Sequence, residues 1–511
     1  MSSVAKIYSA ELEGLEAELV EVEADINVGL HSFNIVGLAD KAVSEAKERV
    51  NSALKNSGIR PPTKENRRIT INLAPADIKK IGSRFDLAIA LAYLLASEQI
   101  KPFETKNKLF IGELSLDGSL RSVTGALNIA LLAKAKGIKE VFVPNTNGRE
   151  AAVVRGIKVF PIKTLVELIG HIEGSHALSP LEETKFVPGV APSIFKMSEV
   201  KGHKGAKRAL TVAAAGSHNV LLSGSPGTGK TMMAQAFASI LPEPTLDESI
   251  EVSKIWSAAG LIGKEPIISS RPFRSPHHTA SLISIIGGGS NPRPGEISLA
   301  HRGVLFLDEL PEFHRDVLES LRQPLENGTV HIARARKTVK FPARFTLVAA
   351  MNPCPCGYFG DKEKECRCSA YDILRYEKKI SGPLLDRIDL QLEIPRISIE
   401  ELRKKAVEDD DEEMVKIVKR ARGIQENRFE ARKLKIFTNS EMSSKMVDEL
   451  VRLDEKAEEF LKKSMEKNFV SARSYYRTLK VSQTIADIEE SEVVREEHAA
   501  EAFHYRLRAS E

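Results

Sequence analysis

Residues 224–231 have the types and spacing of a phosphate-binding loop. They read Gly-Ser-Pro-Gly-Thr-Gly-Lys-Thr, between the apolar run NVLLSG and the helical pattern TMMAQAFASIL. Glycines let successive backbone N–H groups turn toward phosphate oxygens at the positive end of that helix. We expect Lys230 to reach the β- and γ-phosphates of a nucleoside triphosphate, and Thr231 to ligate Mg²⁺. The residues expected to bind the phosphates are Gly224, Ser225, Pro226, Gly227, Thr228, Gly229, Lys230 and Thr231.

A second and a third apolar run also end in polar residues. Residues 304–309 read Val-Leu-Phe-Leu-Asp-Glu, and residues 350–352 read Ala-Met-Asn. After a phosphate-binding loop, Asp308 is expected to help hold Mg²⁺, and Glu309 to polarise a water molecule for attack on the γ-phosphate. Asn352 would lie between the two motifs and could orient that water. These residues predict hydrolysis of a nucleoside triphosphate.

The order of the elements explains how these residues could meet. From about residue 196, apolar strands lead into turns and helices, which is the pattern of a parallel α/β sheet. After about residue 395 the pattern is helical to the end. The N-terminal part alternates β-rich runs with helices and is followed by a polar stretch with Pro and Gly, as expected of a linker. The predicted organisation is an α+β domain at 1–172, a linker at 173–195, an α/β P-loop core at 196–395 and a helical lid at 396–511.

Two local patterns in the N-terminal part give specific expectations. Residues 20–29 alternate apolar and polar side chains, as a half-buried strand does. Residues 44–58 begin with Ser44 and end with Gly58, which predicts an amphipathic helix with Ser44 as its N-cap.

The composition is that of an ordinary soluble protein. The chain has 511 residues, 42% of them hydrophobic and 28% charged, with a net charge of +4. A charge this small excludes a generally basic, histone-like protein but allows a local basic stripe. The sequence has neither a signal peptide nor an apolar run long enough to span a bilayer. We therefore expect a cytoplasmic protein without a membrane partner.

All four cysteines lie within a short segment. They are Cys354, Cys356, Cys366 and Cys368, arranged as two C-x-C pairs. Four thiolates form a tetrahedral structural Zn²⁺ site, which would brace the chain after Asn352. A redox or disulfide pair and a metal-free cluster are the alternatives, because the C-x-C spacing is less common than C-x₂-C. Four thiolates leave no open position, so a catalytic zinc is not expected.

The motifs GVLFLDEL, AMNPCPCGYFGD, ISGPLLDRIDL and SARSYYRTLK resemble the magnesium-chelatase-like branch of the AAA+ family, in its ComM/YifB group. The resemblance covers essentially the whole chain and implies a homo-oligomeric ring, a hexamer, with ATP at subunit interfaces. It places Asn352 at sensor 1, Arg387 at the arginine finger acting on a neighbour's nucleotide, and Arg473 at sensor 2. Ser225, where Pro is common, and His203, where Gln is common, depart from the family pattern without removing a phosphate contact.

Two inserts frame the expected ATPase core. Residues 255–301 are dense in Gly, Pro, Arg and His, and residues 328–342 alternate like a hairpin. In the resembled branch these positions line the central channel of the ring, where basic side chains would follow a DNA backbone without reading bases. The hairpin residues expected to contact DNA are Arg334, Arg336, Lys337 and Lys340.

The alternative to a DNA-binding hairpin is a basic hairpin that is merely solvated. The basic stretch 419–435 is a second DNA candidate, weakened by the acids within it. Adjacent residues point apart on a helix or a strand, so we do not interpret His277 and His278 as a metal-binding pair.

The N-terminal segment resembles the proteolytic domain of Lon, which uses a Ser–Lys dyad. Here Arg84 occupies the nucleophile position and Ser83 is one residue away, while Asn128 and Ala130 stand where lysines would be. A serine hydroxyl without a lysine to take its proton is a poor nucleophile at neutral pH. We therefore expect a degenerate Lon-protease-like scaffold without protease activity.

Three functions compete. The family resemblance implies an ATP-driven motor on single-stranded or branched DNA, of the ring helicase or branch-migration type, acting in recombination during natural transformation. The second is a magnesium-chelatase-type ATPase that remodels a partner protein. The third, an ATP-dependent protease, is disfavoured by Arg84, Asn128 and Ala130.

Overall fold

The computed structural model describes residues 4–64, 66–191, 193–263, 265–289, 291–333, 338–403, 410–467 and 471–506. The chain divides into two compact units. The first comprises Met1–Val187 and Ser249–Ile268, and the second comprises Pro188–Glu248 and Ser269–Glu511.

The first unit is built on two separate sheets. A four-stranded sheet has the order β1-β2-β4-β3, with β1 antiparallel to β2, β2 antiparallel to β4, and β3 parallel to β4. A three-stranded parallel sheet has the order β5-β8-β9. The strands are β1 (Ala5–Glu13), β2 (Glu16–Val28), β3 (Ser32–Val36), β4 (Arg67–Ala74), β5 (Lys108–Phe110), β8 (Glu140–Pro144) and β9 (Lys158–Ile162), with a short pair β6 (Glu113–Leu114) and β7 (Leu120–Arg121).

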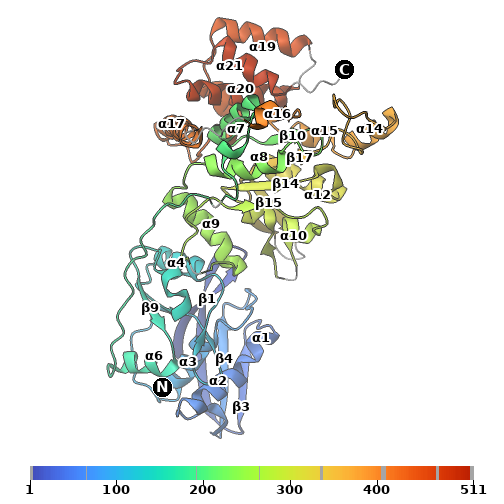
Figure 1. Cartoon of the computed structure of the whole chain (residues 1–511). Helices are drawn as coiled ribbons and strands as arrows, with labels where there is room; N and C mark the ends of the chain where they lie inside the picture. Colours follow the sequence, from blue (N-terminus) through green and yellow to red (C-terminus); the bar gives the residue numbers. More distant parts are fainter. Residues whose placement is uncertain are drawn as a thin grey trace. The chain divides into compact units, whose positions relative to one another are not determined.

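Helices pack on these sheets (Figure 1), and α1, α2, α3 and α6 contribute residues to a large apolar core shared with the strands. The most deeply buried is α3, in which every residue from Asp86 to Leu94 is buried. Such a helix is apolar all round because it has no solvent-facing side. The helices of this unit are α1 (Lys41–Ser44), α2 (Ala46–Asn56), α3 (Asp86–Ala96), α4 (Ala126–Ala135), α5 (Gly148–Ala151) and α6 (Leu165–Glu173).

The two local expectations fare differently. The alternating strand is confirmed, because β2 buries Val20, Val22 and Ala24 in alternation. The Ser44 cap is wrong. Asp40 caps a short helix one turn earlier, its carboxylate accepting from Val43 N at 2.8 Å, so Ser44 lies inside that turn and α2 starts without a side-chain cap.

Part of the first predicted insert belongs to the first unit. Most of the helix α9 (Leu246–Ala259) lies within the segment Ser249–Ile268, which belongs to the first unit. The backbone of Gly125 donates to Ser257 O at 3.0 Å, and the Ser257 hydroxyl donates to the buried carboxylate of Glu150. Residues 255–301 are therefore divided between the units.

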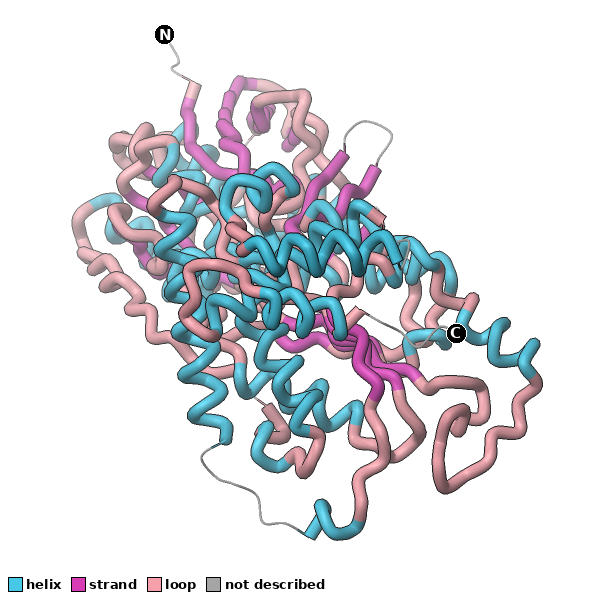
Figure 2. Tube along the Cα trace, turned by 90° about the horizontal axis from the view of Figure 1, so that it is seen from above, coloured by secondary structure: helices cyan, strands magenta, loops and turns pink. Residues whose placement is uncertain are grey.

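The second unit contains a five-stranded, entirely parallel sheet, which confirms the predicted α/β core. Its order is β11-β14-β17-β10-β18, so β10 lies between β17 and β18. The strands are β10 (Val220–Ser223), β11 (Phe273–Arg274), β14 (Val304–Leu307), β17 (Thr346–Met351) and β18 (Leu390–Glu393). Figure 2 draws strands in magenta and helices in cyan.

Alternate residues of these strands enter two different cores. Val220, Val304 and Val348 pack with helices on one face, whereas Leu221, Leu305 and Leu347 pack on the other. A parallel strand covered on both faces is apolar throughout, which explains the continuous apolar runs in the sequence. The first face is covered by α7 (Lys204–Gly216), α8 (Lys230–Ala236), α17 (Asp410–Glu430) and α20 (Ala472–Ile488); the second by α10 (Leu282–Ile286), α11 (Glu296–Leu299), α12 (Arg315–Ser320), α14 (Ala370–Glu377) and α15 (Gly382–Leu385).

Two hairpins and a helical region complete the second unit. One hairpin pairs β15 (Thr329–Ala333) with β16 (Thr338–Pro342), and a shorter one pairs β12 (Gly287–Gly288) with β13 (Arg293–Pro294). In the described residues after β18, every long element is a helix, as predicted. The remaining helices are α13 (Arg322–Asn327), α16 (Ile399–Arg403), α18 (Ser444–Leu450), α19 (Glu455–Lys467) and α21 (Glu496–His504). Among the described helices, none has the length and apolar character needed to cross a membrane.

Candidate active site

Three neighbouring strands deliver the predicted active-site residues to one edge of the sheet. The loop 224–229 follows β10, Asp308 and Glu309 follow β14, and Asn352 follows β17. The pairing aligns Ser223 with Met351 and Leu307 with Ala349, so the three strand ends lie side by side. Parallel strands place their carboxyl ends at the same edge, which is where ligands bind in open α/β sheets.

The phosphate-binding loop needs glycine at two positions. Gly227 and Gly229 have φ values of 81° and 86°, in the left-handed region that favours glycine. Gly229 immediately precedes α8, so the loop opens directly onto the N-terminus of that helix. This is the geometry expected for a loop that cradles phosphates.

Lys230 connects the loop to Asn352. Its Nζ donates to Gly224 O at 2.6 Å, to Ser225 O at 3.0 Å and to Asn352 Oδ1 at 3.2 Å. Burial lowers the pKa of Lys230, and the carboxylate of Asp308 opposes that shift. The ammonium group is therefore held among neutral oxygens, which the oxygens of a phosphate could replace.

Thr231 and Asp308 fit a magnesium ion. The Thr231 hydroxyl donates to Asp308 Oδ2 at 2.8 Å. Adjacent ligands of an octahedral Mg²⁺ at about 2.1 Å lie roughly 3 Å apart, so both oxygens could bind one ion with little movement. Both atoms are hard oxygen donors of the kind that Mg²⁺ prefers.

Glu309 is partly exposed and faces a histidine that was not expected at the site. Its side chain is 58% exposed, and its Oε2 lies 3.5 Å from His278 Nδ1. The rings of His277 and His278 lie with centroids 4.1 Å apart, so the expectation that they point apart is wrong. These residues lie in an irregular segment between β11 and α10, where the helix and strand rules do not apply. The His-His dipeptide in the insert was the available signal for His278.

The two arginines predicted to act on nucleotide lie together. Arg387 Nη2 donates to Glu326 Oε2, and Arg473 Nη2 donates to Glu326 Oε1 at 2.8 Å. Arg387 is only 5% exposed and also donates to Pro383 O at 2.6 Å. In the described contacts of this chain, neither guanidinium reaches the phosphate-binding loop. No sequence motif indicated Glu326, which lies on α13.

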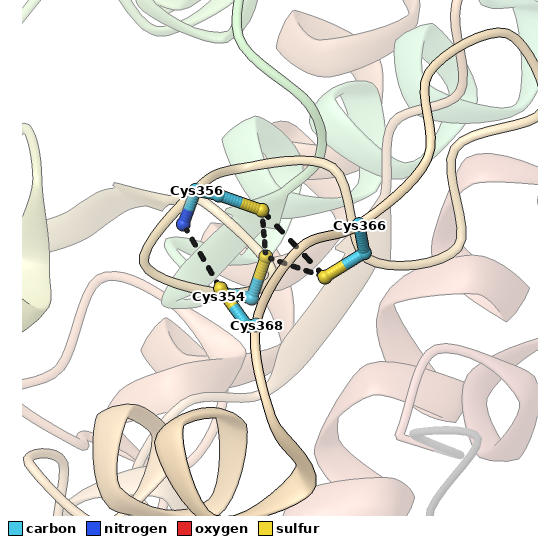
Figure 3. Close-up of side chains that lie close together, drawn as sticks. All are labelled: Cys354, Cys356, Cys366 and Cys368. Atoms are coloured by element: carbon cyan, nitrogen blue, oxygen red, sulfur yellow. Dashed lines mark hydrogen bonds between the residues drawn. The ribbon is translucent and has the colours of Figure 1, made fainter.

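The four cysteines form one cluster (Figure 3). The sulfur of Cys354 lies 3.4 Å from that of Cys356 and 3.7 Å from that of Cys366, and the latter two lie 3.6 Å apart. Cys356 N donates to the sulfur of Cys368 at 3.4 Å. All four are free thiols. Sulfurs at about 2.3 Å from a tetrahedral Zn²⁺ lie roughly 3.8 Å apart, so the cluster fits that ion.

The environment of the cluster favours a thiolate at one position. The backbone N–H groups of Tyr358 and Arg367 lower the pKa of the Cys356 thiol to about 6. Metal binding requires thiolates, and these hydrogen bonds stabilise one before any ion is bound.

Most of the predicted DNA contacts fall outside the described residues. These are Arg334, Arg336 and Lys337. Lys340 is described; it is exposed on β16 and stands opposite His331 of β15. The described strands thus confirm a hairpin here.

In the first unit, the residues compared with the Lon dyad have other partners. The Ser83 hydroxyl donates to Glu113 Oε2, and Arg84 Nη1 lies 3.5 Å from Glu11 Oε1. Asn128 is buried on α4 and donates to Leu15 O at 2.7 Å. The partner of the Ser83 hydroxyl is thus a carboxylate and not a lysine amine, so this contact differs from a Ser–Lys dyad.

Comparisons with known proteins agree with this architecture. Three family models match the chain, described as "Magnesium chelatase, subunit ChlI" at residues 196–402, "Subunit ChlI of Mg-chelatase" at 22–147, and "Magnesium chelatase, subunit ChlI C-terminal" at 408–506.

Similar proteins cover the same range. "Competence protein ComM" of Haemophilus influenzae is 42% identical over 99% of this chain and 97% of its own length. "Uncharacterized protein YifB" of Escherichia coli is 41% identical with the same coverage. The "Magnesium-chelatase 38 kDa subunit" of Rhodobacter capsulatus is 28% identical over 31% of this chain and 51% of its own. The chain therefore belongs to the magnesium-chelatase-like branch of the AAA+ family, in the ComM/YifB group.

Proposed function

We propose that this protein hydrolyses ATP and uses the energy to move single-stranded or branched DNA. The observation that carries the ATPase part is the meeting of the phosphate-binding loop, Asp308, Glu309 and Asn352 at three adjacent strand ends. This arrangement supplies a phosphate-binding loop with its lysine, oxygen ligands for Mg²⁺ and a candidate water-activating carboxylate.

The chain's own residues would divide the reaction between binding and water activation. Lys230 would exchange its carbonyl partners for the β- and γ-phosphate oxygens. Thr231 and Asp308 would hold Mg²⁺, which would supply positive charge to the phosphates. Glu309 would accept a proton from the attacking water, and Asn352, already hydrogen-bonded to Lys230, would orient it.

We propose a ring, with a hexamer as the expected size. Arg387 and Arg473 share Glu326, so they present one face of the subunit together. A neighbour's triphosphate at that face would compete with a single carboxylate for both guanidiniums, and its higher charge favours the exchange. A nucleotide-binding site between two subunits would thus be completed by arginines from the adjacent chain.

The DNA part of the proposal rests on the hairpin and on a relative. The relative from Haemophilus influenzae is named a competence protein, which supports a role in natural transformation. The hairpin carries four basic side chains and few groups that could read bases. We propose that these side chains follow a phosphate backbone.

A magnesium-chelatase-type ATPase acting on a partner protein is the second candidate. The family descriptions favour it, since all three name magnesium chelatase. The two candidates differ in whether DNA stimulates hydrolysis. Protease activity is not proposed, because Ser83 has a glutamate as its partner.

We also propose that the cysteine cluster holds a structural Zn²⁺. The sulfur distances of 3.4–3.7 Å fit tetrahedral coordination. The absence of an open coordination position assigns the ion a structural role.

The first prediction separates phosphate binding from hydrolysis. Lys230→Ala is expected to abolish ATP binding, because it removes the cation that faces the phosphates. Glu309→Gln is expected to keep binding and to lower kcat by roughly 10²–10⁴, the usual contribution of a general base. Equilibrium binding and phosphate release measure the two effects. Wild-type turnover by Glu309→Gln would show that another group activates the water.

The second prediction concerns action between subunits. Arg387→Ala should bind ATP without hydrolysing it, and mixing it with Lys230→Ala should restore part of the activity. Some interfaces of a mixed ring combine an intact phosphate-binding loop with an intact arginine. Light scattering verifies ring formation. A mixture that forms rings but remains inactive would contradict catalysis in trans.

The third prediction concerns zinc. The purified protein should contain about one zinc per chain, and replacing Cys354 and Cys368 with Ser should remove it. The melting temperature should fall by roughly 2–4 °C for each 1 kcal/mol of stability lost. Elemental analysis and calorimetry provide the readouts. Metal-free protein with four thiols that react at once would exclude this site.

The fourth prediction concerns DNA. Arg334→Ala with Arg336→Ala should weaken single-strand binding and DNA-stimulated hydrolysis together, while hydrolysis without DNA persists. Each lost phosphate contact should reduce the salt slope of binding by roughly 0.7. Lys134→Ala with Lys136→Ala, two exposed lysines at the C-terminal end of α4, removes the same charge and is the matched control. Equal effects of the two pairs would mean that only net charge matters.

An unchanged affinity in the hairpin variant would instead move the binding surface to the stretch 419–435. Wild-type protein whose hydrolysis is not stimulated by DNA would favour the chelatase-type candidate.

A further inference from the structure

The segment that carries the cysteines packs directly on the phosphate-binding loop. We name residues 354–368 the cysteine loop. Gly357 has a φ of 85°, and a Cβ placed on it would lie 2.6 Å from Pro226 Cγ and 2.7 Å from Pro226 Cδ. Carbon atoms do not approach this closely, so the two loops touch with no room for a methyl group.

A second contact is polar and involves the residue that departs from the family pattern. The Ser225 hydroxyl acts as a donor toward the carboxylate of Asp361 and is the largest cause that lowers the pKa of Asp361 well below its usual range. Backbone N–H groups of Glu363 and Lys364 and the guanidinium of Arg396 add to that shift. The Asp361 side chain is only 1% exposed. Ser225 therefore has a partner that Pro could not bind.

The cysteine loop is anchored on both sides of the phosphate-binding loop. It leaves the sheet after β17, next to Asn352, and Asp361 bonds Arg396 Nε at 2.6 Å just beyond β18. Because β10 lies between β17 and β18, the cysteine loop bridges the strand from which the phosphate-binding loop emerges.

The cysteine loop has little apolar material to hold it in place. Its side chains between the cysteine pairs are mostly polar, and Phe359 is 51% exposed. The four sulfurs form its centre, and Phe359 N donates to the sulfur of Cys354 at 3.3 Å. Small metal-centred segments of this kind are ordered by ion binding, because few other interactions offset their loss of entropy.

We infer that the cysteine loop positions the phosphate-binding loop, so that metal bound to the four cysteines sets the affinity for ATP. Gly357 and Asp361 are positioning residues that act through Pro226 and Ser225. A loop that must present several N–H groups to phosphate binds best when it is already ordered. The inference rests on the proposed ATP site and on a metal at the cysteines.

Two glycines of the cysteine loop allow a matched test. Gly357→Ala forces a methyl group against Pro226, whereas Gly360 has a similar φ of 77° and nothing within 4 Å of its Cβ. Both substitutions cost backbone strain, but only the first displaces the phosphate-binding loop. Gly357→Ala should raise the Kd for Mg²⁺ and the non-hydrolysable analogue AMP-PNP at least fivefold, with zinc content unchanged. Gly360→Ala should stay within twofold of the wild type.

Should Gly357→Ala fail to fold, Asp361→Asn provides the same test. Glu363→Gln is its control, because Glu363 also pairs with Arg396, at 3.2 Å, but its side chain is 69% exposed. Only Asp361→Asn should weaken AMP-PNP binding, and with ATP as substrate it should raise KM more than it lowers kcat. Equal Kd values for a target variant and its control would overturn the inference.

Removing and restoring the metal tests the second part of the inference, that metal at the cysteines sets the affinity for ATP. Zinc chelated from the full-length chain should raise the Kd for AMP-PNP, and added Zn²⁺ should reverse the change. Full affinity in the metal-free chain, or purification without any metal, would overturn the inference. Lys230→Ala distinguishes a failure of this inference from a failure of the proposed ATP site. If Lys230→Ala abolishes AMP-PNP binding while metal removal leaves the Kd unchanged, the ATP site is supported and its dependence on the metal is disproved.

Discussion

The parallel pairing of β10, β14 and β17 is the constraint on which the active site depends. Phosphate binding, magnesium binding and water activation require groups that are far apart in the sequence, and the aligned strand ends bring them to one edge. The strands are buried on both faces, so a shift in register by one residue would exchange the side chains that pack in the two cores as well as move the site. The stability of the core and the geometry of the site are thus maintained by the same apolar residues.

Two further interactions extend from this edge. The cysteine loop starts beside Asn352, so the cysteine cluster and the Asn352 amide are joined by only a short stretch of backbone. On another side of the unit, Glu326 holds Arg387 and Arg473 while Asp389 holds Arg477 at 2.6 Å. Each of these guanidiniums is therefore paired with a carboxylate within the chain, and the proposed nucleotide contacts of Arg387 and Arg473 would have to replace that pairing.

The elements whose chemistry is local could be predicted from the sequence. The phosphate-binding loop, the acids after β14 and the cysteine cluster can be recognised because the residues of each lie close together in the sequence. Such combinations of residue type and spacing seldom occur by chance. Glu326 and Asp361 could not be found in this way, because each acts through a partner at least 30 residues away, as the 61 residues between Glu326 and Arg387 illustrate. The His277–His278 dipeptide was visible in the sequence, but the contact of His278 with Glu309 was not. The misplaced Ser44 cap failed for a different reason, since Asp40 offered a competing cap one turn earlier.

The placement of Ser249–Ile268 has a consequence for the order of synthesis. The partner that Glu150 holds, Ser257, lies 107 residues further along the chain. At 5–20 residues per second, the ribosome needs roughly 5–20 s to add them, and in that time it also makes the phosphate-binding loop. The first unit is therefore completed only after part of the second has been translated. Until α9 has emerged from the ribosome, the nascent chain lacks the Ser257 hydroxyl that donates to the Glu150 carboxylate in the folded protein.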